Sequence, residues 1–297
     1  MFGFNNVLCF MGLFCIGNLT SSVLSRPMSV YALPNAMPNA VPNIIPVVVL
    51  HGLESSSANI EPFCEWLRTS FDVPVFNIEI GNGEKTSLYT PLTEQLDELC
   101  ETIYNIDELQ DGFNFIGISQ GGLLARGYVE QCNLYPVVNL ITLVTPHGGE
   151  YFSAIKFDMY SDFFQKHFSV AGYWRNPNDL QNYYNKCTYL PIFNNEVNNS
   201  YALKHVGNII SLTNFVMVWS SSDSVLNPPE SGKFSFFDEN LSVVSLEDTE
   251  LYKNDLLGLR FLDETGKLHS YETNCSHVDH RNPECYSQIY NILINYL

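Results

Sequence analysis

Short apolar runs alternate with amphipathic segments along the chain from residue 46 onward. The runs fall at 46–50, 73–80, 113–118 and 137–144. The first of them, PVVVL, has no polar position and predicts a strand buried on both faces of a sheet. Residues 91–106 repeat leucine and isoleucine at helical spacing, which predicts an amphipathic helix. This alternation predicts an α/β fold with a mostly parallel central sheet flanked by helices.

The pattern changes after residue 150. Residues 150–210 are rich in aromatic side chains and lack the alternation that is typical of strands. We therefore expect a helical and irregular insert there, before the apolar run NFVMVWS at 214–220 resumes the sheet. The prediction is one α/β domain over 47–297, interrupted by an insert at about 150–210.

The N-terminal region has a different composition. Residues 7–17 form an apolar run of signal-peptide length, too short for a spanning helix of about 20 residues. We predict a signal peptide over 1–25, with an ordinary buried or anchoring helix as the alternative. Residues 26–46 carry five prolines, which predicts an extended linker or propeptide. No later stretch is apolar and long enough to predict a transmembrane segment.

The net charge restricts the classes of binding partner, and the cysteine content bears on metal sites, disulfides and the cellular compartment. The chain has 297 residues, a net charge of −18 and a pI near 4.6, which argue against nucleic acid as a partner. Of eight cysteines, six follow the predicted signal peptide, and none has the spacing of a metal site. Disulfides are therefore expected, with several pairings open. Three Asn-X-Ser glycosylation sequons follow the predicted signal peptide, at Asn198, Asn240 and Asn274, and also favour the secretory pathway.

The segment FIGISQGG at 115–122 carries the candidate nucleophile. Ser119 lies in a G-x-S-x-G motif between a predicted strand and a predicted helix, the context of a nucleophile elbow. The backbone N–H of Gln120 then points toward a developing oxyanion. A second donor is expected from Leu53, because the sequence LHGL follows the first buried strand. We expect His51 in that turn to hold the loop rather than to act as a base.

The partners of a nucleophilic serine follow in the order acid, then histidine. Asp223 comes directly after the strand at 214–220, which favours it over Asp238 and Asp255. Two histidines, His277 and His280, precede the last predicted helix, and spacing alone leaves both open as the base.

In its motifs the chain resembles the palmitoyl-protein thioesterases, lysosomal enzymes with the α/β-hydrolase fold. The resemblance runs from about residue 47 to the C-terminus and rests on VVVLHGL, GISQGGLLAR, AGYWRNPNDL, VNNSYA, SDSVLNP and LYKNDLLGLR. It implies Ser119 as the nucleophile, Asp223 as the acid and Leu53 and Gln120 as the oxyanion donors. It favours His280 over His277 as the base, because the family histidine lies about 15 residues before the C-terminus.

The resemblance also assigns other residues. It implies a disulfide between Cys100 and Cys132, and Cys275 and Cys285 are candidates for a second. Cys64 and Cys187 stay unassigned. Asn198 matches a glycosylated position of the family.

The expected function is therefore that of a serine thioesterase without a metal or cofactor. Its expected substrates are fatty-acyl thioesters (S-acylated proteins or peptides, or acyl-CoA), and its expected location is the lysosome or the cell exterior. The insert at about 150–210 is expected to line a groove for the acyl chain, with a core of the insert's own as the alternative role for its aromatic residues. A secreted carboxylester lipase with the same triad is the first alternative. A catalytically silent lipid- or protein-binding member is the second. Acyl-chain length, leaving group and oligomeric state are not predicted.

Overall fold

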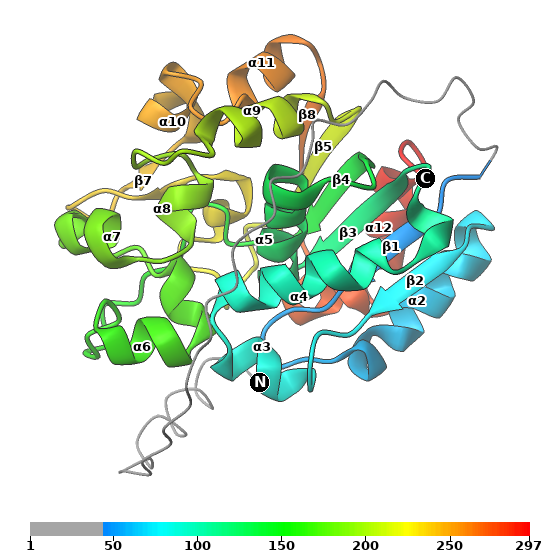
Figure 1. The fold of residues 1–297 in the computed structure, drawn as a ribbon, viewed down its shortest axis with the longest axis horizontal. Helices are drawn as coiled ribbons and strands as arrows, with labels where there is room; N and C mark the ends of the chain where they lie inside the picture. The colour runs from blue at the N-terminus through cyan, green and yellow to red at the C-terminus, as the bar shows by residue number, and fades with distance from the viewer. Residues whose placement is uncertain (1–43) are drawn as a thin grey trace. The chain divides into compact units, whose positions relative to one another are not determined.

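The computed structural model describes residues 44–297. The predicted signal peptide, 1–25, and nearly all of the predicted linker, 26–46, lie outside the described residues. The domain is built on a six-stranded sheet in the order β2-β1-β3-β4-β5-β8, with every neighbouring pair parallel (Figure 1). The strands are β1 (Val47–Leu50), β2 (Val75–Ile78), β3 (Phe113–Ile118), β4 (Val137–Leu143), β5 (Asn214–Ser220) and β8 (Leu268–Thr273). The parallel α/β prediction is confirmed.

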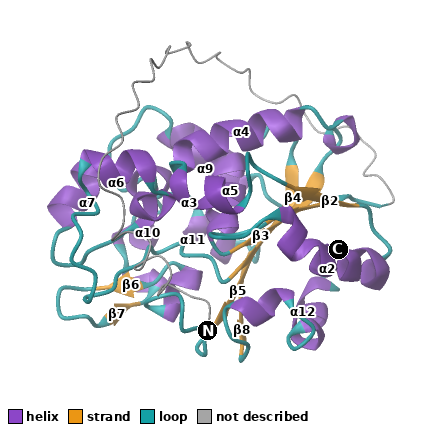
Figure 2. Cartoon of the chain, turned by 90° about the horizontal axis from the view of Figure 1, so that it is seen from below, coloured by secondary structure: helices purple, strands orange, loops and turns teal. Residues whose placement is uncertain are grey.

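Helices cover both faces of this sheet (Figure 2). On one face α2 (Ser57–Phe71) and α12 (Tyr286–Leu293) pack against alternate residues of the central strands. The opposite face is covered by α4 (Leu92–Tyr104) and α5 (Gln120–Gly127). The central strand β3 is buried along its whole length, which accounts for its lack of polar alternation.

The insert between β4 and β5 is helical and irregular, as predicted. Its elements are α6 (Asp162–His167), the 3₁₀ segment η3 (Ser169–Tyr173), α7 (Leu180–Lys186), α8 (Leu190–Phe193) and α9 (Ala202–Ile210). A buried ion pair ties this region together: Arg175 Nη1 lies 2.7 Å from Glu196 Oε1. The Arg175 guanidinium also stacks 3.9 Å from the centre of the Phe236 ring.

The segment between β5 and β8 contains short elements that the hydrophobic pattern does not predict. They are η4 (Pro229–Lys233), the hairpin β6 (Phe236–Phe237) and β7 (Val243–Val244), η5 (Leu246–Asp248), α10 (Glu250–Lys253) and α11 (Leu259–Glu264). Strand β8 was not predicted from the sequence, because it is a partly buried edge strand in which polar and apolar residues are mixed.

Two disulfides cross-link the domain, and both match the expected pairs. Cys100 of α4 is bonded to Cys132, which ends the π-helical turn η2 (Tyr128–Cys132) after α5. Cys275 is bonded to Cys285, enclosing the loop before α12. Cys64 and Cys187 are free and buried, and burial raises the pKa of each thiol to about 12. Among residues 44–297, no helix has the length and apolar character needed to cross a membrane.

Candidate active site

Ser119 occupies a sharp turn between β3 and α5. Its backbone has φ 53° and ψ −126°, a conformation in which a non-glycine residue is strained and which is typical of a nucleophile elbow. Glycine is required two residues later, because a Cβ on Gly121 would lie 2.3 Å from the carbonyl oxygen of His51. The loop after β1 therefore packs directly against the elbow, and the serine hydroxyl stands at the carboxyl edge of the sheet.

Asp223 follows β5 at the same edge and is 5% exposed. Its Oδ1 accepts hydrogen bonds from the backbone N–H groups of Val225 (2.8 Å) and Leu226 (3.0 Å). These bonds fix the carboxylate and leave Oδ2 for another partner. Asp238 and Asp255, the rejected alternatives, instead accept backbone N–H bonds within their own turns.

His277 connects Asp223 to Ser119. Its Nδ1 lies 2.6 Å from Asp223 Oδ2, and its Nε2 lies 3.0 Å from Ser119 Oγ. With Nδ1 protonated toward the carboxylate, Nε2 has its lone pair directed at the serine hydroxyl. This is the arrangement needed to accept the serine proton.

The prediction that His280 is the base is wrong, because His277 and not His280 is hydrogen-bonded to Ser119. His280 is fully buried, with Nε2 2.8 Å from Thr273 Oγ1 and Nδ1 2.9 Å from the carbonyl oxygen of Ser276. Burial lowers its pKa, which favours the neutral ring. His280 thus supports the loop, while His277, the alternative that spacing left open, reaches the serine.

The two expected oxyanion donors flank Ser119. Gln120 begins α5, whose first N–H groups have no partner within the helix. The Gln120 side chain points away from its own backbone N–H, because its Nε2 donates to the carbonyl oxygen of Ser87 at 2.7 Å. On the other side, a Cβ on Gly52 would lie 2.9 Å from Ser119 Cβ, so the backbone leading to Leu53 lies against the serine.

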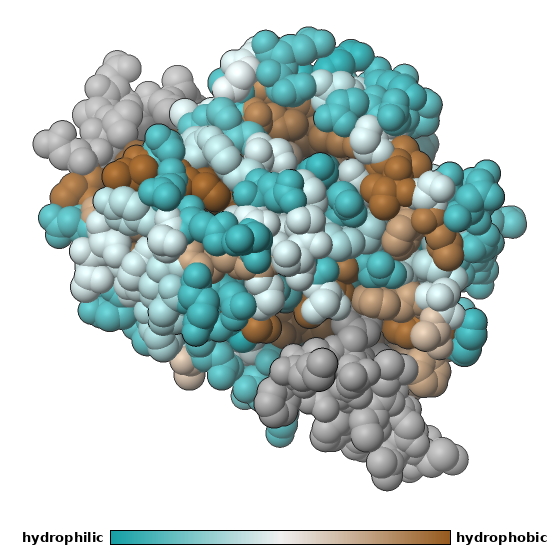
Figure 3. Space-filling view, turned by 180° about the vertical axis from the view of Figure 1, so that it is seen from behind, coloured by the Kyte–Doolittle hydropathy of each residue, from teal (hydrophilic) through white to brown (hydrophobic). Residues whose placement is uncertain are grey.

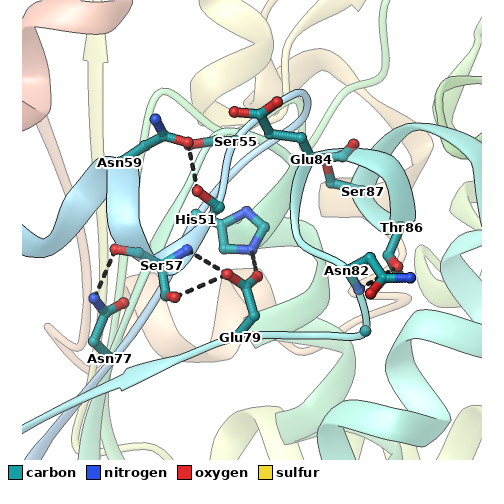
Figure 4. A network of polar contacts seen from close by, with 12 residues as sticks. His51, Ser55, Ser57, Asn59, Asn77, Glu79, Asn82, Glu84, Thr86 and Ser87 are labelled. Carbon is teal, nitrogen blue, oxygen red and sulfur yellow. Dashed lines mark hydrogen bonds and ion pairs between the residues drawn. The ribbon is translucent and has the colours of Figure 1, made fainter.

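The loop after β1 is attached to its surroundings at two points. His51 is hydrogen-bonded to Glu79 at 2.6 Å, and Figure 4 shows this pair beside the N-terminus of α2. Arg281 Nη1 donates to Ser55 Oγ at 2.7 Å, although the two residues are 226 positions apart. Glu79 was not among the residues predicted for the site. Its position at the end of the predicted strand 73–80, on the edge that carries His51, was the signal that could have found it.

The aromatic residues of the insert are divided between its interior and its surface. Four tyrosines of the insert, whose aromatic residues were predicted to line an acyl groove, are buried: Tyr160, Tyr173, Tyr183 and Tyr189. Phe163 of α6 is instead 55% exposed. On the face shown in Figure 3, hydrophobic residues gather in small groups among hydrophilic ones.

A cavity of about 370 Å³ lies elsewhere, between β5, β8 and the segment around 230–252. Charged side chains contribute to its lining, among them Glu230, Lys233, Glu247 and Asp263. Ser119, Asp223 and His277 do not line it. Because the catalytic candidates do not line it, this cavity is not part of the candidate active site.

Fold and site together define an α/β-hydrolase with a serine, histidine and aspartate in hydrogen-bonding sequence. A structure with a similar fold is the product of the gene lin2722 from Listeria innocua. It aligns with a TM-score of 0.50 and 10% identity over 86% of this chain and 96% of the other.

The chain belongs to the palmitoyl protein thioesterase family, whose sequence model matches residues 46–277. It is 34% identical to Palmitoyl-protein thioesterase 3 of Dictyostelium discoideum over 79% of this chain and 85% of that protein. It is 29% identical to Lysosomal thioesterase PPT2-B of Xenopus laevis over 76% of this chain and 83% of that protein. With Palmitoyl-protein thioesterase 1 of Caenorhabditis elegans it shares 29% identity over 69% and 76% of the two chains.

Proposed function

We propose that this protein is a serine hydrolase that cleaves long-chain fatty acyl groups from thioesters, with S-acylated proteins or peptides and acyl-CoA as the substrate classes. The observation that carries the proposal is the continuous hydrogen-bonded series Asp223–His277–Ser119 in a chain of the palmitoyl protein thioesterase family. The names of its relatives support the thioester as the bond that is cleaved.

The reaction proceeds in two acyl transfers. His277 Nε2 accepts the Ser119 proton as Oγ attacks the thioester carbonyl, and Asp223 stabilises the imidazolium. The oxyanion is held by the backbone N–H groups of Leu53 and Gln120, where losing one donor costs about 10²–10³-fold in rate. The carbon–sulfur bond breaks, the thiol leaves with the proton, and an acyl-serine remains. Water activated by His277 then releases the fatty acid and restores Ser119.

The acyl chain is proposed to bind along the insert at about 150–210, whose exposed aromatic side chains include Phe163. Each methylene that leaves water contributes about 0.8 kcal/mol, so this region would select chain length.

The proposed location is the lysosome or another compartment of the secretory pathway. Two disulfides support an oxidising route. The relative from Xenopus laevis is named a lysosomal thioesterase. The three sequon asparagines, Asn198, Asn240 and Asn274, are exposed on the described surface, as N-glycosylation requires.

The test is a comparison of two substrates with the same acyl group. Purified protein is assayed on palmitoyl-CoA and on p-nitrophenyl palmitate, with Ser119→Ala as the inactive control. A higher kcat/KM for the thioester supports the proposal. A strong preference for the oxygen ester indicates the carboxylester lipase instead. Failure of a fluorophosphonate probe to label Ser119 would indicate a catalytically silent member.

A further inference from the structure

Glu79 is an acidic residue next to the active site that the proposed reaction does not use. It follows β2 directly and lies at the carboxyl edge of the sheet. One carboxylate oxygen, Oε1, lies 2.6 Å from His51 Nε2. The other, Oε2, accepts hydrogen bonds from the Ser57 N–H and hydroxyl, both at 2.8 Å (Figure 4).

Both ring nitrogens of His51 face hydrogen-bond acceptors. Nδ1 lies 2.9 Å from the carbonyl oxygen of Gly52, and because a carbonyl only accepts, the ring donates in this bond. Nε2 faces the Glu79 carboxylate. The ring itself is 4% exposed, so water provides little alternative.

Glu79 is a suitable acceptor for the His51 ring. Partial burial raises the pKa of this carboxyl. The hydrogen bonds from Ser57 and the nearby His51 outweigh burial, so the pKa lies below its usual range. Glu79 therefore accepts hydrogen bonds as a carboxylate.

The Gly52 carbonyl and the Leu53 N–H belong to the same peptide group. In a trans peptide these two groups point in opposite directions, and rotating one rotates the other. The bond from His51 Nδ1 to the Gly52 oxygen therefore sets the direction of the Leu53 N–H. Gly52 itself packs against Ser119, so this peptide lies beside the reacting group.

We propose that Glu79 and His51 are positioning residues that aim the Leu53 N–H at the oxyanion. Glu79 holds the His51 ring, the ring holds the Gly52 carbonyl, and the peptide plane directs the Leu53 N–H. Neither side chain touches the substrate. The inference rests on the proposed function, because it names the support of one oxyanion donor in that reaction.

The test compares Glu79→Gln with Glu61→Gln. Glu61 serves as the control because its carboxylate, like that of Glu79, accepts side-chain hydrogen bonds, from Asn77 and Arg68 at 2.6 Å each, but it is not bonded to His51. Glu79→Gln should lower kcat on palmitoyl-CoA by about 10- to 100-fold, up to the loss seen when one donor is removed. KM should change by less than about twofold, because the donor acts in the transition state. Glu61→Gln should retain wild-type kcat.

A second measurement separates positioning from a structural role. A palmityl trifluoromethyl ketone forms a tetrahedral adduct with an oxyanion, so its inhibition constant should rise in Glu79→Gln by the same factor as kcat/KM falls. A loss of stability alone would shift the melting temperature and leave the inhibition constant of the folded enzyme unchanged.

The double variant completes the test. In a His51→Ala background, Glu79→Gln should cause little further loss of kcat, because Glu79 acts through His51. An equal loss in both backgrounds, or wild-type kcat in Glu79→Gln, overturns the proposal. If Glu79→Gln does not fold, His51→Ala alone must show the same selective loss of kcat. Wild-type protein without turnover or probe labelling would refute the proposed function instead.

Discussion

The two histidines of the loop before α12 provide a decisive comparison. His277→Ala removes the only group bonded to both Ser119 Oγ, at 3.0 Å, and Asp223 Oδ2, at 2.6 Å, among the described residues. Without a base, the hydroxyl keeps its proton and only the oxyanion donors contribute to catalysis. We expect kcat to fall by about 10⁴–10⁶-fold. Because the His277 side chain is only 10% exposed and its removal leaves the buried Asp223 carboxylate without this partner, stability should also fall, so turnover is normalised to the folded fraction.

His280→Ala should have the opposite result. It leaves the buried Thr273 hydroxyl and the Ser276 carbonyl without their partner and opens a cavity at a fully buried site. The lost hydrogen bonds and the cavity should together lower the free energy of unfolding by about 2–4 kcal/mol. In a domain of this size the melting temperature should fall by about 5–15 °C. Turnover by the folded fraction should stay within about tenfold of wild type, since His280 does not touch Ser119.

The assay is palmitoyl-CoA turnover together with fluorophosphonate labelling, both measured well below the melting temperature of the variant. Circular dichroism gives the folded fraction for normalisation. Loss of labelling in His280→Ala with full labelling in His277→Ala would refute the assignment. Equal loss of labelling in both variants without unfolding would mean that the conformation of the loop, rather than the His277 ring alone, is required.

Three further predictions concern other parts of the site and core. Asp223→Asn should lower kcat by about 10⁴-fold, measured on palmitoyl-CoA, because the amide oxygen will take the two backbone bonds and turn an N–H toward His277, fixing the wrong tautomer. Cys275→Ser/Cys285→Ser should lower the free energy of unfolding by about 3 kcal/mol, measured by urea denaturation. It should also reduce turnover more than stability accounts for. Burial raises the pKa of Glu130 to about 8, so its contribution to stability is complete below the unfolded value and is lost as pH rises toward 8. The wild type should therefore lose melting temperature relative to Glu130→Gln between pH 5 and pH 8.

Each of these predictions has a control. Asp238→Asn should retain turnover, because Asp238 only caps an exposed turn. Cys100→Ser/Cys132→Ser should lower stability without a separate loss of turnover, since Ser119, although it lies inside that loop, is held by the turn between β3 and α5. A melting-temperature difference between wild type and Glu130→Gln that stays constant with pH would contradict the raised pKa.

The local parts of the site were predictable from the sequence. The glycines around Ser119 and the strand before it specify the elbow through backbone sterics alone. Asp223 follows a recognisable buried strand, and the order of strands and helices predicts a shared edge. The elbow and the strand before Asp223 each depend on residues within a few positions of one another, and over such short distances the hydrophobic pattern predicts structure well.

The base was predicted wrongly because its assignment relied on a distance from the C-terminus. That distance depends on where the last helix ends and on the length of the tail beyond it. Neither of these determines which histidine faces Ser119. Hydrogen bonds to Thr273 and Ser276 decide that His280 turns inward. The contact between Glu79 and His51 likewise spans 28 residues and depends on the packing of β2 beside β1.

The bond between Arg281 and Ser55 has a consequence for how the protein matures. It joins the loop of the oxyanion donor to the loop of the base across nearly the whole described chain. A chain still being synthesised has its nucleophile and oxyanion loop long before it has His277. The Asp223–His277–Ser119 series can therefore form only after the chain has been made past His277 and the loop before α12 has folded against the loop after β1. The elbow that carries Ser119 is made first, and the segment that follows β8 brings the proposed triad together.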